Sequence, residues 1–290
     1  MTSPKTNILL KKTFSLLSAV RGYNILILIA AQYFAAIFIF SEKKVLKPVL
    51  LDWHLLFLVI ATVSVVAAGY IINNFYDSNA DKINRPLKYG VDSYVKQETK
   101  LSLYFLLNFI GFSFGWLVSW RAAFFFACYI FSIWLYSHKL KKYPLLGLIT
   151  ASTLTILPFF VIFVHYKNFS SVIFIHAFFL FFVILVRELI KDLENIRGAI
   201  ANGYNTFPIV YGIKKTKMTI SLTLVLTLIP IVFLYRFPAI EYMKYYFYFA
   251  GMVLTATGFL TWKANTRKQY TILHNILNCL LYTSPSPRDA

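Results

Sequence analysis

Long stretches without charge recur along this chain, and they restrict its fold more than any other feature of the sequence. A helix needs about 20 mainly apolar residues to cross a bilayer, and a backbone in lipid must satisfy its own hydrogen bonds. Eight such stretches occur, at residues 23–40, 55–72, 101–119, 122–137, 145–164, 171–187, 218–235 and 245–262, and a ninth begins near Tyr270. The pattern predicts an all-α, polytopic membrane helical bundle with eight complete transmembrane helices and a truncated ninth.

The composition supports one membrane domain. Hydrophobic residues make up 59% of the 290-residue chain, charged residues only 14%, and the mean hydropathy is +0.65, which is too apolar for an ordinary soluble domain. The segments between apolar stretches reach roughly thirty residues, too few to bury a core of their own. We therefore expect a single transmembrane domain over residues 1–278.

Residues 279–290, CLLYTSPSPRDA, change in character from membrane helix to a short Ser- and Pro-rich string. The string resembles the in-frame translation of a sequencing-library adapter, and artificial segments are excluded from fold reasoning. We expect a non-native, adapter-derived tail at 279–290, which would interrupt the native chain within its ninth helix.

The basic residues are distributed unevenly between the two sides of the membrane. The formal net charge is +18, which alone would be compatible with nucleic acid binding. With a cytoplasmic N-terminus, however, cytoplasmic Lys and Arg outnumber those on the opposite side roughly threefold, the positive-inside pattern. We therefore predict a multi-pass protein of the cell (inner) membrane, with a cytoplasmic N-terminus and no nucleic acid partner. The two cysteines and five histidines form no ligand spacing and are assigned no chemistry.

A group of acids directly follows the second apolar stretch, in NNFYDSNADKINRP at residues 73–86. On a helix, Asn73, Asp77 and Asp81 are one turn apart and share one face. Carboxylate and amide oxygens suit Mg²⁺, which also takes water and substrate phosphate as ligands. The alternative is a solvated helix end whose acids pair with Lys82 and Arg85. Acids at a membrane edge are usually functional, which favours the metal site.

This segment, NNxxDxxxDxxNRP, resembles the first aspartate motif of the UbiA-type membrane prenyltransferases. The resemblance implies a UbiA-like bundle of nine helices around a cavity open toward the bilayer, with aspartate-rich motifs at the ends of helices two and six. It also implies Mg²⁺-assisted transfer of a polyprenyl group from a prenyl diphosphate to a membrane-soluble acceptor. Asp77 and Asp81 would be catalytic and, with Asn73, would bind the metal.

Two further segments are similar to the same family. RGYNILI at residues 21–27 resembles the family's opening of helix one, and YSHKLKKYPLLG at residues 136–147 resembles the basic loop after helix four. The implied substrate-binding residues are Asn24, Asn73, Lys82, Arg85, Tyr136, Lys139 and Lys141.

The segment RELIKDLENIRGAIANGYNTFPIVYG, residues 187–212, resembles the second motif but departs from it. Where the family commonly has two aspartates, this chain has Asn195 and Ala199. Glu188, Asp192 and Asn195 fall on one helix face at i, i+4 and i+7, so they could rebuild the metal site, with Asp192 also catalytic. Glu194 points elsewhere and is expected to pair with Lys191 or Arg197.

Several alternatives stay open. The loss of a carboxylate at Ala199 is compatible with a catalytically impaired UbiA-fold paralogue. A membrane transporter would place its acids near the midplane, whereas these acids lie at helix ends on one side. The acceptor could be an aromatic quinone precursor or a glycerol-phosphate-type lipid, and the neighbourhood of Asp192 is closest to the glycerol-phosphate branch of the family. The prenyl chain length and the oligomeric state are left open.

Overall fold

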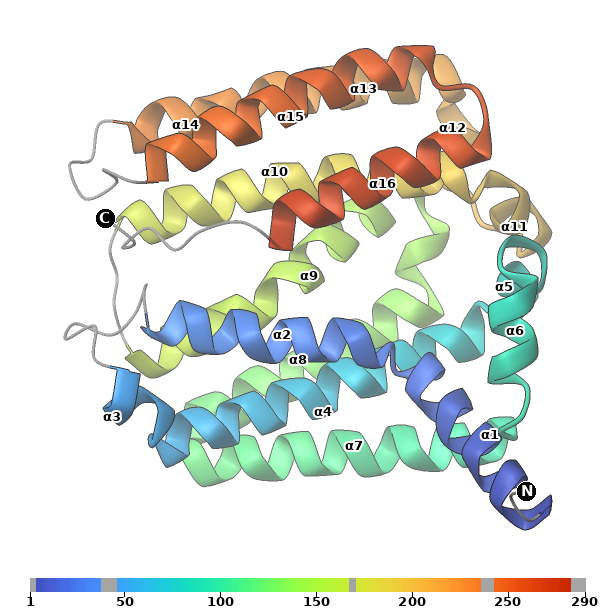
Figure 1. Ribbon diagram of the computed structural model, residues 1–290, viewed down its shortest axis with the longest axis vertical. Coiled ribbons are helices and arrows are strands. Elements are labelled where there is room, and N and C mark those ends of the chain that lie inside the picture. The colour runs from blue at the N-terminus through green and yellow to red at the C-terminus, as the bar shows by residue number, and fades with distance from the viewer. Residues whose placement is uncertain (1–3, 38–45, 167–170, 236–242, 283–290) are drawn as a thin grey trace. The chain divides into compact units, whose positions relative to one another are not determined.

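The computed structural model describes residues 4–37, 46–166, 171–235 and 243–282, and in these ranges it contains helices and no strand (Figure 1). The helices of the first half are α1 (Pro4–Ala19), α2 (Gly22–Ala35), α3 (Leu46–Leu50), α4 (Trp53–Tyr76), α5 (Ser78–Asn84), α6 (Pro86–Asp92), α7 (Gln97–Val118) and α8 (Trp120–His138). After a short 3₁₀ turn, Leu140–Lys142, follow α9 (Pro144–Tyr166), α10 (Ser171–Glu194), α11 (Ile196–Ala201), α12 (Phe207–Tyr211), α13 (Ile213–Leu226), α14 (Leu228–Leu234), α15 (Met243–Lys263) and α16 (Arg267–Tyr282).

The chain forms two compact units. Unit 1 consists of Met1–Ala30, Leu51–Lys139 and Arg197–Gly203, and unit 2 of Ala31–Leu50, Leu140–Ile196 and Tyr204–Ala290. The first aspartate motif therefore belongs to unit 1, and most of the second belongs to unit 2.

In unit 1, α4 packs along α7, and both contact α8 (Figure 1). Glycines on α7 allow this close approach, because side chains of the neighbouring helices occupy the space that a Cβ would need. A Cβ at Gly111 would lie 2.5 Å from a methyl carbon of Val65, and one at Gly115 would lie 2.6 Å from the ring of Phe126. Small residues at such contacts are typical of helix packing in membranes.

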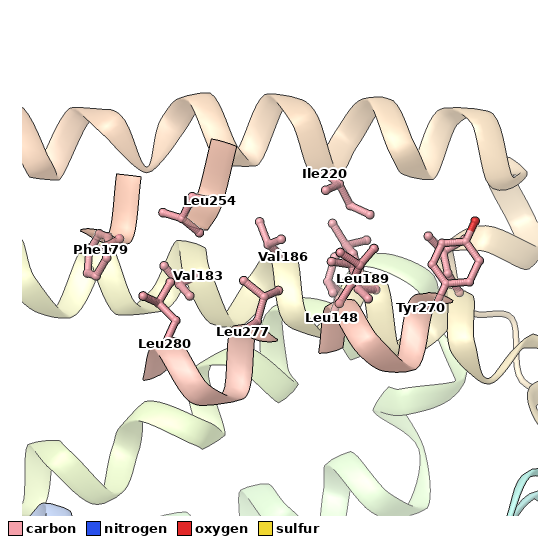
Figure 2. Packing of buried hydrophobic residues seen from close by; sticks show 14 of the residues in the cluster. Leu148, Phe179, Val183, Val186, Leu189, Ile220, Leu254, Tyr270, Leu277 and Leu280 are labelled. Carbon is pink, nitrogen blue, oxygen red and sulfur yellow. The ribbon is translucent and has the colours of Figure 1, made fainter. Parts of the chain in front are cut away.

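In unit 2, α10 lies at the centre and contacts α9, α13, α14 and α16. Its buried residues Phe179, Val183 and Val186 recur at helical spacing and face α16 and α15, as Figure 2 shows. Lys217 ties α13 to the end of α15, since its ammonium group donates to the carbonyls of Trp262 at 3.2 Å and Ala264 at 2.7 Å.

The helices agree with the predicted apolar stretches in position, but fewer of them qualify as membrane spans. Among the described residues, six helices or helix pairs are long and apolar enough to cross a bilayer, or seven if residues 11–19 and 22–35, bent by 52°, form one span. The six are α4, α7, α8, α9, α10 and α13 with α14. The predicted count of eight complete helices and a ninth is therefore not confirmed.

Two helices account for much of this difference. In α15, three tyrosines among the first six residues lower the hydropathy, and α16 has only 16 residues, several of them polar. Of the predicted non-native tail, residues 279–282 continue α16, and the remaining residues lie outside the described part of the chain.

Candidate functional site

The first aspartate motif keeps a helical backbone across the junction of α4 and α5. The N–H of Asp77 donates to the carbonyl of Asn73 at 2.9 Å, and the N–H of Asp81 donates to that of Asp77 at 2.8 Å. The one-turn hydrogen bonds thus continue although α4 ends at Tyr76. Asn73, Asp77 and Asp81 are all half-buried. Their oxygen-bearing side chains therefore follow one another at intervals of one turn, as the spacing predicts.

The ion-pair partner of Asp81 is Lys88. Its Nζ lies 3.6 Å from Asp81 Oδ2 and 3.5 Å from Asp92 Oδ2. The alternative interpretation from the sequence paired the acids with Lys82 and Arg85, and for Asp81 this is corrected to Lys88. Lys82, the residue after Asp81, is exposed, and Arg85, directly after α5, is half-buried.

Asp92, the second partner of Lys88, belongs to a set of buried polar residues that the sequence analysis missed. Asn74 Nδ2 donates to Asp92 Oδ2 at 2.9 Å, and Asn74 Oδ1 accepts from Lys100 at 3.2 Å. Lys100 is 2% exposed and Asp92 3% exposed. The signal in the sequence was faint: an acid and a lysine in the segment between two apolar stretches, which solvent could equally have accounted for.

The NRP end of the first motif is held by α11. Gly198 donates its N–H to Asn84 Oδ1 at 3.2 Å. A Cβ at position 198 would lie 2.1 Å from Asn84 Nδ2 and 2.9 Å from the carbonyl of Ala80. Only glycine therefore fits here without displacing α5, which carries Asp81.

We expect Gly198→Ala to destabilise the protein by about 1–3 kcal/mol, because overpacking forces side chains and backbone to move. Gly90→Ala is the matched control, since nothing lies within 4 Å of its added methyl group and Gly90 is also helical. Thermal unfolding in detergent measures both variants. Equal stability of the two would contradict the close contact at Gly198.

The other substrate-binding residues predicted in unit 1 lie at helix ends. Asn24 is half-buried in the first turn of α2, next to Arg21, whose guanidinium lies over the ring of Tyr70 at 4.9 Å. Tyr136 is half-buried near the end of α8, and Lys139, directly after α8, is exposed.

Lys141, the remaining predicted diphosphate contact, belongs to unit 2 and is only 8% exposed. Its ammonium group lies over the ring of Tyr204, 5.2 Å from the centroid. The carbonyl of the next residue, Lys142, accepts from the backbone N–H of Asn205 at 3.0 Å. The basic loop is thus fixed against the segment that follows α11, where the family-like GYNTFP sequence lies.

In the second motif, Glu188 is engaged by two cations. Its Oε1 accepts from Arg187 at 2.6 Å and its Oε2 from Lys191 at 2.7 Å, and the residue is 5% exposed. A metal ion at Glu188 would compete with these two cations, because both carboxylate oxygens already accept a hydrogen bond. The predicted metal-binding role of Glu188 stays a prediction, and the contacts themselves stabilise α10.

The other residues of this motif differ in their surroundings. Asp192 is half-buried and interacts with the backbone N–H of Phe207. Asn195 is half-buried, and its Nδ2 donates to the carbonyl of Lys191 at 2.9 Å. Glu194 pairs with His274 on α16, 2.9 Å away, so the predicted pairing with Lys191 or Arg197 is corrected, and this histidine has a role that the sequence analysis did not assign.

The donors of the first motif fit a hard cation. Within the described residues, no group of three or more His, Cys, Asp or Glu side chains is placed to hold a metal ion. Two carboxylates and an amide on successive turns would need further oxygen ligands. This is usual for Mg²⁺, which commonly binds one or two carboxylates together with waters and substrate phosphates.

Comparison with known proteins gives a consistent match. Residues 20–278 match the model of the UbiA prenyltransferase family. The digeranylgeranylglyceryl phosphate synthase of Methanobrevibacter smithii is 30% identical over 236 residues, which are 77% of this chain and 79% of that protein. The enzyme of the same name from Sulfurisphaera tokodaii is 32% identical over 178 residues, 60% of this chain and 64% of that protein.

Solved structures agree with the fold. A structure of a digeranylgeranylglyceryl phosphate synthase aligns with a TM-score of 0.67 and 21% identity, covering 94% of this chain and 98% of that one. A UbiA homologue from Archaeoglobus fulgidus, bound to GPP and Mg²⁺, aligns with a TM-score of 0.69 and 12% identity, covering 92% of this chain and 97% of that one.

Proposed function

The chain belongs to the UbiA prenyltransferase family, and from that premise we propose that it adds a geranylgeranyl group to a glycerol-phosphate lipid that already carries one. The relatives named digeranylgeranylglyceryl phosphate synthase support this choice of donor and acceptor, because such a product has two prenyl chains on one glyceryl phosphate. The observation that carries the reaction class is the one-turn spacing of Asn73, Asp77 and Asp81 through the end of α4.

We propose that Mg²⁺ is the cofactor and that Asn73, Asp77 and Asp81 hold it. The solved relative bound to GPP and Mg²⁺ supports this assignment. When bound, Mg²⁺ neutralises diphosphate charge as the carbon–oxygen bond ionises. In the second motif, Asp192 and Asn195 are the proposed ligands, and Asp192 is proposed to act with Asp77 and Asp81 in catalysis.

The remaining polar residues bind the charged end of the substrate. Lys82, Arg85, Lys139 and Lys141 supply fixed positive charge for the departing pyrophosphate, which stabilises its charge as it develops. Asn24 and Tyr136 complete the set of proposed contacts. The prenyl tail belongs among the apolar side chains of the bundle, where the allylic cation is kept from water until the acceptor hydroxyl attacks it and loses its proton.

The membrane topology is part of the proposal. We propose eight complete transmembrane helices, with α15 among them, and a truncated ninth that contains α16. The roughly threefold excess of Lys and Arg on one side supports a cytoplasmic N-terminus in the cell membrane. Both aspartate motifs then belong to the cytoplasmic side.

A catalytically impaired paralogue is the second candidate, and Ala199 favours it. This residue stands where the family commonly has an aspartate, and it is 7% exposed on α11. A methyl group offers no ligand to a metal. If the missing carboxylate at position 199 makes the protein inactive, Ala199→Asp should create prenyl transfer activity.

The test uses purified protein in detergent with radiolabelled geranylgeranyl diphosphate, Mg²⁺ and geranylgeranylglyceryl phosphate. We expect a labelled digeranylgeranyl product whose formation stops when EDTA removes the metal. A parallel reaction offers 4-hydroxybenzoate as an aromatic acceptor. Labelling of the aromatic compound alone would replace the proposed acceptor, and turnover only after Ala199→Asp would favour the impaired paralogue.

A further inference from the structure

Lys88 lies between two carboxylates at nearly equal distances. Its Nζ is 3.6 Å from Asp81 Oδ2 and 3.5 Å from Asp92 Oδ2. The two acids differ in burial: the side chain of Asp81 is 20% exposed, and that of Asp92 is 4% exposed. One lysine on α6 thus bridges a residue of the first aspartate motif and a buried acid for which the proposed reaction has no use.

Asp92 has further polar contacts besides Lys88. The side-chain amide of Asn74 donates to Asp92 Oδ2 at 2.9 Å, and Lys100, 2% exposed, donates to Asn74 Oδ1 at 3.2 Å. The Ser15 hydroxyl also donates to the Asp92 backbone carbonyl at 3.3 Å, which holds α1 against α6. Removing one member of a buried charged set usually costs stability, because an uncompensated charge remains.

The charges in this cluster balance. Asp81 and Asp92 contribute two negative charges, and Lys88 and Lys100 contribute two positive ones. If a divalent cation binds Asp81, Lys88 faces a like charge at close range, and such repulsion is not fully screened in a partly buried site. The flexible lysine stem allows the ammonium group to move by a small distance. Asp92 then offers it a carboxylate that is already in place.

We propose that Lys88 is an exchangeable counter-cation of Asp81. It pairs with Asp81 when the first motif holds no metal, and Asp92 retains it when Mg²⁺ takes the Asp81 carboxylate. Lys88 and Asp92 are thus positioning residues that set the metal affinity of the first motif without touching the metal. This inference rests on the proposed function, because it requires Asp81 to be a metal ligand.

The two residues should shift metal affinity in opposite directions. Lys88→Met removes the competing cation, and we expect it to tighten Mn²⁺ binding about fivefold, the factor that corresponds to roughly 1 kcal/mol. Asp92→Asn leaves Lys88 with only Asp81 to pair with, so binding should weaken by a similar factor. In the Lys88→Met background, Asp92→Asn should change the affinity less than about twofold, because its effect acts through Lys88.

The experiment is an Mn²⁺ titration of the 290-residue protein in detergent with inorganic pyrophosphate, followed by electron paramagnetic resonance. Lys96→Met, at an exposed lysine just before α7, is the control for loss of one positive charge and should leave affinity unchanged. Lys88→Arg, which keeps the positive charge, should bind Mn²⁺ with nearly the affinity of the unaltered protein. If Lys88→Met does not fold, the double variant Lys88→Met with Asp92→Asn, which loses one charge of each sign, replaces it. The double variant should bind Mn²⁺ more tightly than Asp92→Asn alone.

The possible failures are distinguishable. Absence of Mn²⁺ binding in the unaltered protein would overturn both the proposed metal site and the role of Lys88. If the unaltered protein binds Mn²⁺ but Lys88→Met and Asp92→Asn shift the affinity in the same direction, or not at all, only the role of Lys88 is overturned. An undiminished effect of Asp92→Asn in the Lys88→Met background would also overturn it, since Asp92 would then act directly.

Discussion

Asp77→Asn is expected to lower kcat/KM for prenyl transfer at least about a hundredfold, the size of loss typical when a group that stabilises developing charge is removed. Asp77 is the middle member of the one-turn series, so it lies one turn from both Asn73 and Asp81, the other proposed ligands of the first motif. The amide has nearly the same shape, and the Asp77 side chain makes no capping hydrogen bond to α5. The variant should therefore fold, and the loss should appear in turnover of geranylgeranyl diphosphate.

Asp52→Asn is the matched control at the other end of α4. Asp52 caps this helix, because its Oδ1 accepts from the N–H groups of His54 at 2.9 Å and Leu55 at 3.3 Å. Asparagine caps helices about as well as aspartate. The control should keep activity within about twofold, since it alters the same chemical group without touching the motif. Comparable activity in the two variants would rule out the proposed role of Asp77.

Glu188→Gln should destabilise the protein by roughly 3 kcal/mol, near the lower end of the cost of breaking a buried ion pair. The change leaves Arg187 and Lys191 close together with no anion between them. Their side chains are 15% and 35% exposed, so water relieves part of the repulsion. Chemical denaturation in detergent micelles measures the free energy of unfolding.

Glu98→Gln provides the comparison, because Glu98 is an exposed acid in the first turn of α7. Its replacement should change stability by less than about 0.5 kcal/mol. The same pair of variants also addresses the predicted metal role of Glu188. A stable Glu188→Gln protein with weakened Mn²⁺ binding would restore Glu188 as a ligand and refute a purely stabilising role.

The positions of the helices could be predicted from hydropathy, but their ends could not. Hydropathy ends the stretch 171–187 at its first charged residue, whereas α10 continues to Glu194; only the one-face spacing of Glu188, Asp192 and Asn195 indicated that the helix goes further. The helix goes on because Glu188 binds Arg187 and Lys191 within its own turns, so the charges satisfy one another. Similarly, α13 begins at Ile213, before the predicted start at 218, since a lysine-rich first turn is helical without being apolar.

The candidate site was predictable where it depends on local spacing. The one-turn series of Asn73, Asp77 and Asp81 requires only a helical backbone. Partners distant in sequence were not predictable, because hydropathy and spacing contain no information about them. Lys100 reaches Asn74 across 26 residues, and His274 reaches Glu194 across 80. Only the folded chain shows which polar side chains are paired with each other.

The glycine contacts along α7 also restrict how a lipid substrate could reach the interior. At Gly111 the backbone of α7 nearly touches α4, where a single methyl group would collide with Val65, and at Gly115 it meets Phe126 of α8 in the same way. A contact that has no room for one methyl group has none for an isoprenoid tail. If a prenyl donor enters from the bilayer, we therefore expect it to pass between other helices than α7 and α4 at Gly111 or α7 and α8 at Gly115.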